Sequence, residues 1–248
     1  MMILLSCAKT MSKHSKIQVP ASTNPVFQKE ASKIILHLSQ YSVNELKEIL
    51  HVPERLAAEN SLRFHEFHSN ETPSLQALLA YTGIVFKNID PKNFTLEDFT
   101  YAQEHLRITS FCYGLLRPMD TIKPYRLEGN VTIPELGAEN MFDFWQKRLT
   151  RPFIQEIIKN GGIFNLASHE MKSLFDWKLV ENKTRIITPE FKIIKRGKPT
   201  TVVIYTKMAR GAMTRYIIKN RIENPEEIKS FEWEGFHFHK EDTKSGIY

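Results

Sequence analysis

A run of cations in the last third of the chain carries the clearest chemical signal in the sequence. Residues 207–215 read Lys-Met-Ala-Arg-Gly-Ala-Met-Thr-Arg, and no acidic residue stands between Lys207 and Arg221. In a helix with about 100° per residue, one polar face would hold Lys207, Arg210, Thr214 and Arg221. The small residues Gly211 and Ala212 would let another backbone approach closely. This pattern indicates contact with phosphate groups.

The net charge is concentrated in the same region. The chain carries 34 Lys+Arg and 28 Asp+Glu, a formal net charge of +6. Residues 183–221 hold eleven basic side chains and one acidic one, whereas residues 1–182 are balanced and residues 222–248 are acidic. Such a block indicates a polyanionic partner. A solvated surface neutralised by acidic neighbours elsewhere in the fold would explain the same block, and charge alone leaves both interpretations open.

A second cationic segment lies near the middle of the chain. Arg107, Arg117, Lys123 and Arg126 are accompanied by one acid, Asp120. We expect a helix before Gly114, a tight turn at Gly114 and a second helix after it, which together resemble a helix-hairpin-helix element. Backbone N–H groups of such an element face a phosphate. The usual hairpin has two glycines, and this one has a single glycine.

Two weaker motifs follow expected strands. Ser6-Cys7-Ala8-Lys9-Thr10 comes after an apolar run and could hold an anion, although it lacks the glycines of a phosphate-binding loop. Residues 165–170 could supply a nucleophile at Ser168, but adjacent positions rarely form a catalytic triad, and a helix cap is the simpler role. No metalloprotease, hydrolase or dinucleotide-binding motif occurs in the sequence.

The histidines and cysteines do not indicate a metal site or a redox centre. The pairs His65/His68 and His237/His239, the latter near Glu241 and Asp242, match no metal-ligand spacing. We therefore expect no metal and no cofactor. Two cysteines, Cys7 and Cys112, are typical of a reducing compartment. With no signal peptide and no apolar run of membrane-spanning length, we expect a cytoplasmic protein without a membrane partner.

The elements that must position these residues indicate a mixed α/β fold. Hydrophobic residues make up 42% of the chain and charged residues 25%, which excludes a disordered or fibrous protein. Helices interleave with at least five expected strands, so we expect a single α+β domain over residues 1–248 with a mixed sheet and surrounding helices. No linker or internal repeat divides the chain.

Individual elements follow from periodicity and from start and stop signals. Residues 1–7 predict a buried strand, and residues 95–108 predict a helix capped by Thr95. A long amphipathic helix is expected over residues 140–159 and a basic helix over residues 208–222. The expected strands are residues 83–89, 163–167, 184–195, 200–206 and 231–238, with a hairpin turn at residues 196–199.

Taken together, these segments resemble the YaaA family of bacterial peroxide stress response proteins. The resemblance rests on Ile3–Thr10, Arg55–His65, His105–Leu127, Asn165–Ser168 and Lys207–Asn220. These segments follow one another across nearly the whole chain, and the run ending in Pro-Tyr-Arg-Leu-Glu is the most specific. Cys7 and Cys112 stand where the family commonly has Pro and Gly, so neither fits a family-wide peroxide sensor.

The resemblance implies a DNA-binding protein with a helix-hairpin-helix element and a positively charged cleft for duplex DNA. It also implies a role in limiting oxidative damage, linked to intracellular iron. The positions that match the family motifs are Lys9, Thr10, Gly114, Arg117, Tyr125, Arg126, Lys207, Arg210 and Arg215. Arg107, Lys123 and Lys219 join them as predicted DNA-binding residues because they lie in the two cationic segments.

The sequence thus leads to one favoured function and one alternative. The favoured function is binding of double-stranded DNA, mainly through its phosphates, by a monomer with no assigned catalytic residue. The alternative is an enzyme that acts on a nucleotide, nucleic acid or other phosphorylated substrate in the same cleft, with Lys9, Asn165 and Ser168 as site candidates. Direct iron binding is the weakest hypothesis, since no cluster of ligands can be assembled from the spacing.

Overall fold

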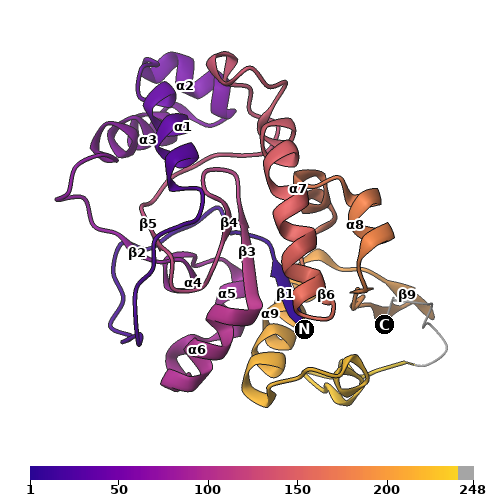
Figure 1. Ribbon diagram of the computed structural model, residues 1–248. Helices are drawn as coiled ribbons and strands as arrows, with labels where there is room; N and C mark the ends of the chain where they lie inside the picture. Colours follow the sequence, from indigo (N-terminus) through magenta and orange to yellow (C-terminus); the bar gives the residue numbers. More distant parts are fainter. Residues whose placement is uncertain (240–248) are drawn as a thin grey trace.

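A five-stranded sheet organises the computed structural model, which describes residues 1–239 (Figure 1). Its strand order is β4-β3-β1-β6-β7, and its strands are β1 (Met2–Leu5), β3 (Leu106–Ser110), β4 (Gly114–Leu116), β6 (Ile163–Asn165) and β7 (Ile186–Ile187). β1 runs parallel to β3 on one side and to β6 on the other, and only β4 is antiparallel to its neighbour. The mixed α/β class predicted from the sequence is confirmed.

Helices cover both the sheet and its ends. They are α1 (Gln28–Leu38), α2 (Val43–Leu50), α3 (Glu54–Glu66), α4 (Ala77–Ala80), α5 (Ile84–Ile89), α6 (Leu96–His105), α7 (Met141–Lys159), α8 (Trp177–Lys183) and α9 (Val203–Asn220). In Figure 1, α1, α2 and α3 gather at the top of the molecule, while α6 and α9 lie at the bottom. Within residues 1–239, no helix is long and apolar enough to cross a membrane.

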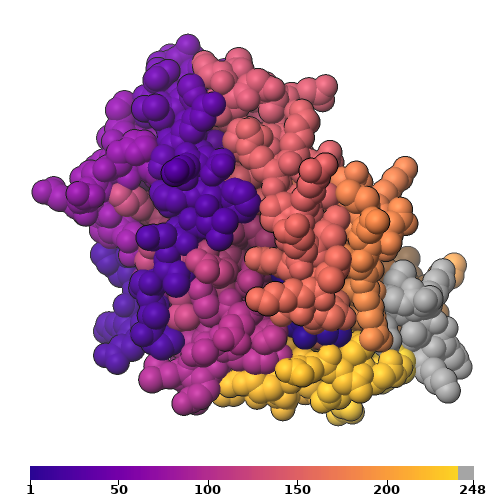
Figure 2. Space-filling view, viewed as in Figure 1, coloured from indigo at the N-terminus to yellow at the C-terminus, as the bar shows by residue number. Residues whose placement is uncertain are grey.

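Two small ribbons and a C-terminal segment complete the described part of the chain. β2 (Leu75–Gln76) pairs with β5 (Thr121–Ile122), and β8 (Ile193–Lys195) pairs with β9 (Lys198–Thr200). The segment after α9 runs along the bottom of the molecule, where Figure 2 shows it in yellow.

The central strand β1 is completely buried. Met2, Ile3, Leu4 and Leu5 have no exposed surface, as expected of a parallel strand that has neighbours on both edges. The next strand of this sheet after β1 is β3, which lies on one side of β1. The next strand after β6 is β7, which lies on the opposite side of the sheet. The carboxyl ends of β1 and β6 therefore flank the position where the direction of the connections changes, and such positions form crevices that bind ligands in α/β folds.

A glycine brings α9 into close contact with α5. A Cβ atom at Gly211 would lie 2.2 Å from the carbonyl oxygen of Val85 and 2.8 Å from Cβ of Asn88. Only a residue without a side chain permits this approach. The contact places the preceding residue, Arg210, beside the start of α5 and the end of β1.

Asp98 joins the start of α6 to the end of α9. Its carboxylate accepts a hydrogen bond from the backbone N–H of Thr95, which completes a capping box. It also pairs with Nζ of Lys219 at 2.7 Å and with Nη2 of Arg221 at 2.8 Å. Desolvation opposes ionisation of Asp98, but the hydrogen bonds from Lys219, Thr95 and Arg221 outweigh it, and the pKa of Asp98 is lowered.

The helix-hairpin-helix predicted for residues 105–118 is wrong. Residues 106–110 form β3, residues 114–116 form β4, and the two strands pair as an antiparallel hairpin. All five residues of β3 are buried, and β3 also pairs with β1, so sheet burial overrides the helical signal of the preceding α6. Gly114 has a φ of +72° and packs against the ring of Trp145. A Cβ atom at this position would lie 2.6 Å from the ring.

Several other elements also differ from the sequence-based expectation. Residues 83–89 form α5 instead of a strand, since a short apolar run is compatible with either structure. The hairpin turn at residues 196–199 is confirmed, but its strands are shorter, and α9 already begins at Val203. Residues 231–238 contain only an isolated bridge between Trp233 and Phe236.

The polar face predicted for α9 is also incorrect in part. Thr214 is fully buried and donates to the carbonyl oxygen of Arg210, while Ile217 and Ile218 are buried as well. The helix is buried around most of its circumference. Only its first turns present cations to the carboxyl edge of the sheet.

Substitution of Gly211 by Ala should destabilise the fold because the added methyl group meets backbone atoms of α5, which cannot move aside cheaply. Overpacking of this kind costs about 1–3 kcal/mol. Urea titration followed by circular dichroism would measure the change in the free energy of unfolding. Val203→Ala, at an exposed position of the same helix, is the control and should change stability much less. Equal stability of Gly211→Ala and the unsubstituted protein would contradict the close contact.

Substitution of Asp98 by Asn should destabilise the fold by about 2–3 kcal/mol at neutral pH, because two cations about one-third exposed would lose their shared carboxylate. A lowered pKa stabilises the folded state above the unfolded-state pKa of about 3.9. The difference in stability between the two proteins should therefore remain constant from pH 7 to about pH 5 and shrink as pH falls further. Denaturation curves across this range would test it, with Glu104→Gln, an exposed position of the same helix, as the control.

Candidate functional site

A cavity of about 330 Å³ lies at the carboxyl ends of β1 and β6. Its lining comes from the end of β1 and the segment after it, the start of α5, the β3–β4 turn, residues 125–128, residues 166–171 after β6, and two residues of α9. The polar and charged residues that line it are Ser6, Cys7, Lys9, Thr10, Tyr125, Arg126, Glu128, Ser168, Glu170, Lys207 and Arg210. The sheet topology thus gathers segments that are up to 200 residues apart.

Two of the cations in the lining share one carboxylate. Lys9 Nζ lies 2.8 Å from Oε2 of Glu128, and Arg126 Nη2 lies 2.7 Å from Oε1 of the same residue. Desolvation opposes ionisation of Glu128, but the hydrogen bonds from Lys9 and Arg126 prevail and lower its pKa. Nε of Arg126 is buried and has no hydrogen-bond partner, so this arginine keeps one donor available.

The two cations contributed by α9 have no internal partner. Within residues 1–239, no ion pair or hydrogen bond satisfies the side chain of Lys207 or Arg210. Nε of Arg210 is buried, and desolvation lowers the pKa of its guanidinium group. Buried donors in folded proteins are nearly always paired. An unpaired buried guanidinium group in a cavity therefore indicates a site for an anion.

Hydrogen bonds between hydroxyl groups hold the two strand ends together. The backbone N–H of Ser168 donates to Oγ of Ser6 at 2.8 Å, and the two hydroxyl groups lie 3.2 Å apart. Tyr125 is buried, and its hydroxyl group bonds to those of Tyr81 at 2.8 Å and Ser110 at 2.7 Å. Tyr125 therefore positions the Arg126 segment through a buried network and does not present its hydroxyl group to a ligand.

The structure brings together five of the twelve predicted DNA-binding residues with free or partly free side chains: Lys9, Thr10, Arg126, Lys207 and Arg210. Each of the remaining charged residues is committed to an internal contact. Arg107 is buried and bonds to Glu156 at 2.7 Å, and Arg117 bonds to Asp120 at 2.8 Å.

The other predicted cations bond to backbone carbonyl oxygens or to a carboxylate. Lys123 donates to the carbonyl oxygens of Phe67 and Ser69, both at 2.6 Å, and desolvation lowers its pKa. Arg215 donates to the carbonyl oxygens of Ile89 and Asp90 at the end of α5. Lys219 pairs with Asp98. These residues stabilise the fold around the cavity. Two of them, Arg215 and Lys219, belong to the basic block of residues 183–221, so part of that block serves the fold.

Sequence reasoning missed the carboxylates and the apolar wall of the cavity. Glu128 follows Arg126 by two residues, and that spacing was a signal for the ion pair between them. Phe86 and Phe111 line the cavity from α5 and from the β3–β4 turn. No local pattern indicates that these two aromatic residues share a wall. Of the enzymatic candidates, Lys9 and Ser168 line the cavity, whereas Asn165 is buried and accepts a bond from the N–H of Ala167.

A short helical hairpin does occur, although not where the sequence placed it. α2 and α3 are joined by His51, Val52 and Pro53, and His51 has a φ of +52°. The first turn of α3 has no side-chain cap. The N–H groups of Leu56 and Ala57 donate to the carbonyl oxygen of Pro53, whereas those of Glu54 and Arg55 have no partner within residues 1–239. Helix N-termini of this kind are favourable positions for phosphate groups.

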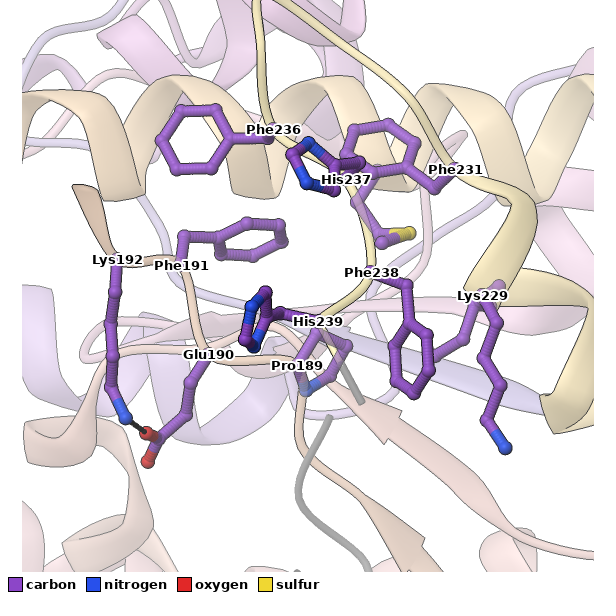
Figure 3. A pocket seen from close by; sticks show the side chains of 12 residues that line it. Pro189, Glu190, Phe191, Lys192, Lys229, Phe231, Phe236, His237, Phe238 and His239 are labelled. Atoms are coloured by element: carbon purple, nitrogen blue, oxygen red, sulfur yellow. Dashed lines mark ion pairs between the residues drawn. The ribbon is translucent and has the colours of Figure 1, made fainter. Parts of the chain in front are cut away.

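A second cavity near the C-terminal segment is lined by aromatic rings. Phe191, Phe231 and Phe236 surround it, and His237 and His239 stand at its edge (Figure 3). Glu190 and Lys192 form an ion pair at 2.9 Å beside it. Within residues 1–239, no three His, Cys, Asp or Glu side chains are grouped as metal ligands. Glu241 and Asp242, considered with these histidines, lie outside the described residues.

Fold and site define a mixed α/β protein with a cationic cavity at the switch point of its sheet. Comparison with known proteins assigns the family. The chain belongs to the peroxide stress protein YaaA family, whose sequence profile matches residues 1–242.

Relatives of similar length share this sequence throughout. A UPF0246 protein of Bacteroides thetaiotaomicron is 61% identical over 96% of this chain and 93% of its own length. UPF0246 proteins of Porphyromonas gingivalis and Clostridium beijerinckii are 44% and 37% identical, over 100% and 97% of this chain and 98% and 94% of their own lengths. The resemblance read from the motifs is confirmed.

Membership in a peroxide stress family directs attention to the two thiols. Burial raises the pKa of the Cys7 thiol to about 12 and raises that of Cys112 well above its usual range. Cys112 has no exposed surface. Peroxide reacts with the thiolate form. Both cysteines are therefore protonated at neutral pH and poorly suited to sense peroxide.

Exposure of the folded protein to hydrogen peroxide at pH 7 should leave Cys7 and Cys112 reduced, because neither forms an appreciable amount of thiolate. Alkylation after treatment, followed by mass spectrometry of the two cysteine peptides, measures this directly. The same treatment in concentrated urea is the control and should oxidise both residues. Rapid formation of a sulfenic or sulfinic acid on Cys7 in the folded protein would show that its thiol is activated after all.

Proposed function

We propose that the protein binds double-stranded DNA through its phosphate groups and that this binding serves the peroxide stress response. The observation that carries the proposal is the pair Lys207 and Arg210, which lies at the carboxyl edge of the sheet without an internal partner within residues 1–239. Lysine and arginine with no internal counter-charge supply the sequence-independent part of DNA binding. The physiological part of the proposal is that bound DNA is protected from damage linked to intracellular iron.

The surroundings of this pair favour an extended polyanion over a small anion alone. The β8–β9 hairpin leads directly into α9 and carries Lys195, Arg196 and Lys198, all exposed. Lys9 and Arg126 also line the cavity and share Glu128. A DNA backbone that crosses the mouth of the cavity would meet these cations together with Lys207 and Arg210.

The α2–α3 hairpin supplies a second place for phosphate contact. Lys47 precedes the turn and Arg55 follows it, and the N-terminus of α3 lacks a side-chain cap. Contacts of this kind fix the orientation of a duplex but do not read its sequence. The proposal therefore describes binding with little preference for base sequence.

A second candidate function is an enzyme that acts on a nucleotide or another phosphorylated substrate. The specific observation in its favour is that Lys9 and Ser168 line the same cavity as the unpartnered guanidinium group of Arg210. The hydroxyl group of Ser168 lies beside Ser6, and no histidine is among the cavity-lining residues. Ser168 thus lacks the adjacent base that activates a serine nucleophile, which makes DNA binding the better supported function. Turnover of nucleotides or DNA by the purified protein would reverse this order.

The double variant Lys207→Ala/Arg210→Ala should weaken binding of a 20-base-pair duplex at least tenfold, because two unpaired cations are removed from the contact surface. The logarithm of the affinity of the unsubstituted protein should fall with the logarithm of the salt concentration with a slope of about −4 to −5, and the double variant should have a slope smaller by about 2. Fluorescence anisotropy at several salt concentrations measures both quantities.

Lys29→Ala/Lys33→Ala is the matched control, since it removes the same charge from exposed positions of α1, which do not line the cavity. We expect it to weaken binding less than the α9 double variant does. Equal losses for the two double variants would indicate a diffuse basic surface instead of a defined site. Binding unaffected by salt and by Lys207→Ala/Arg210→Ala would refute the proposed function.

A further inference from the structure

We infer that the cavity at the carboxyl ends of β1 and β6 binds one nucleotide, with its phosphate on Arg210 and Arg126 and its base against the apolar wall. The inference deepens the proposed function and rests on it where the nucleotide belongs to bound DNA. Contact of a duplex backbone with Lys207 and Arg210 does not account for the apolar part of the cavity lining, so the cavity itself requires a separate explanation.

The polar end of the cavity contains donors that nothing in the described protein satisfies. Nε of Arg126 and Nε of Arg210 are both buried and unpaired. Lys207 adds a third cation without an internal partner within residues 1–239. A buried, unpaired donor costs about 1–3 kcal/mol or more if it stays unpaired. Phosphate oxygens are acceptors that arginine favours, and they would give these unpaired Nε–H groups a partner.

The charge of the lining matches a phosphate monoester. Lys9, Arg126, Lys207 and Arg210 contribute four positive charges, and two carboxylates, Glu128 and Glu170, offset two of them. The remaining +2 is close to the opposite of the charge of about −1.5 to −2 that the monoester of a free nucleotide carries at neutral pH. A phosphodiester within DNA carries about −1 and would offset half of it. A fully neutralised lining would have no such preference.

The remaining wall fits a flat, apolar group. Its larger apolar side chains include Leu5, Phe86, Phe111, Leu127, Leu166 and Met171. Inorganic phosphate would leave this surface without a partner. Proteins that take up a single extruded nucleotide hold its base between aromatic and apolar side chains. A volume of about 330 Å³ is near the lower end of the range for small-ligand sites, which suits one nucleotide and excludes a duplex.

The same chemistry describes two sources of ligand, a free mononucleotide or a nucleotide extruded from a duplex. Isothermal titration calorimetry with deoxyribonucleoside 5′-monophosphates, the matching nucleosides and inorganic phosphate tests the site itself. We expect the monophosphates to bind at least tenfold more tightly than either inorganic phosphate or the nucleosides. Arg210→Ala should abolish the advantage of the monophosphate over the nucleoside, whereas Lys195→Ala, outside the cavity, should preserve it.

Fluorescence anisotropy with three duplexes distinguishes the sources. The first duplex is fully paired, the second has one unpaired nucleotide at its centre, and the third has the same unpaired sugar-phosphate without its base. If the cavity takes an extruded nucleotide, the second duplex should bind about tenfold more tightly than the first, and the third should lose most of this gain. If the monophosphates bind but the three duplexes bind equally, the ligand is a free nucleotide.

The outcomes separate this inference from the proposed function. Normal binding of the paired duplex, with no gain from the unpaired nucleotide and no advantage of the monophosphates over inorganic phosphate, would overturn the nucleotide site and leave DNA binding intact. Failure of every duplex to bind, with the monophosphates still bound, would overturn the proposed function and retain the site. A loss of the unpaired-nucleotide gain in Arg210→Ala but not in Lys195→Ala would support both together.

Discussion

The placement of β1 between two parallel neighbours determines where chemistry can occur in this protein. A strand buried on both faces and both edges leaves only its ends for contact with a ligand. Because the chain leaves β1 and β6 in opposite directions, no connection crosses the crevice between their carboxyl ends. Ser6 and Ser168, which follow these strands, are joined by hydrogen bonds and form the floor of the same cavity. Every other element can be understood by how it closes or charges this crevice.

Helix α9 supplies Lys207 and Arg210 to the cavity, and its position depends on an uncharged contact at Gly211. Gly211 lets α9 lie against the backbone of α5, and Lys219 and Arg221 anchor the far end of the helix on Asp98. Arg215 holds the end of α5 through two carbonyl groups. Three cations of the helix region thus serve the fold, and this arrangement keeps Lys207 and Arg210 in place. A cation of this helix serves the fold where an acceptor lies within its reach, and it remains available for a ligand where none does.

This division explains how much of the site could be predicted from the sequence. The buried first strand, the helix capped by Thr95 and the cationic character of Lys207 and Arg210 are local properties, and they were predicted correctly. The ion pair of Lys219 with Asp98 spans 121 residues, so no pattern around Lys219 distinguishes it from Arg210. Residues 106–116 were misassigned because a helix leads into them without a break, and their pairing with β1 depends on a partner a hundred residues away.

The environments of the two thiols and of the cavity cations bear on how this protein could act in peroxide stress. A thiol that senses peroxide must be ionised and accessible. Cys112 is buried and meets neither condition, whereas Cys7 lines the cavity but has its pKa raised by desolvation. The guanidinium group of Arg210 is also partly desolvated, but it keeps its charge because arginine resists deprotonation. Cys7 and Arg210 line the same cavity, where low polarity disfavours the thiolate and strengthens the attraction of the guanidinium group for an anion. The proposed role in peroxide stress therefore depends on an anion held at the carboxyl edge of the sheet and does not require oxidation of either thiol.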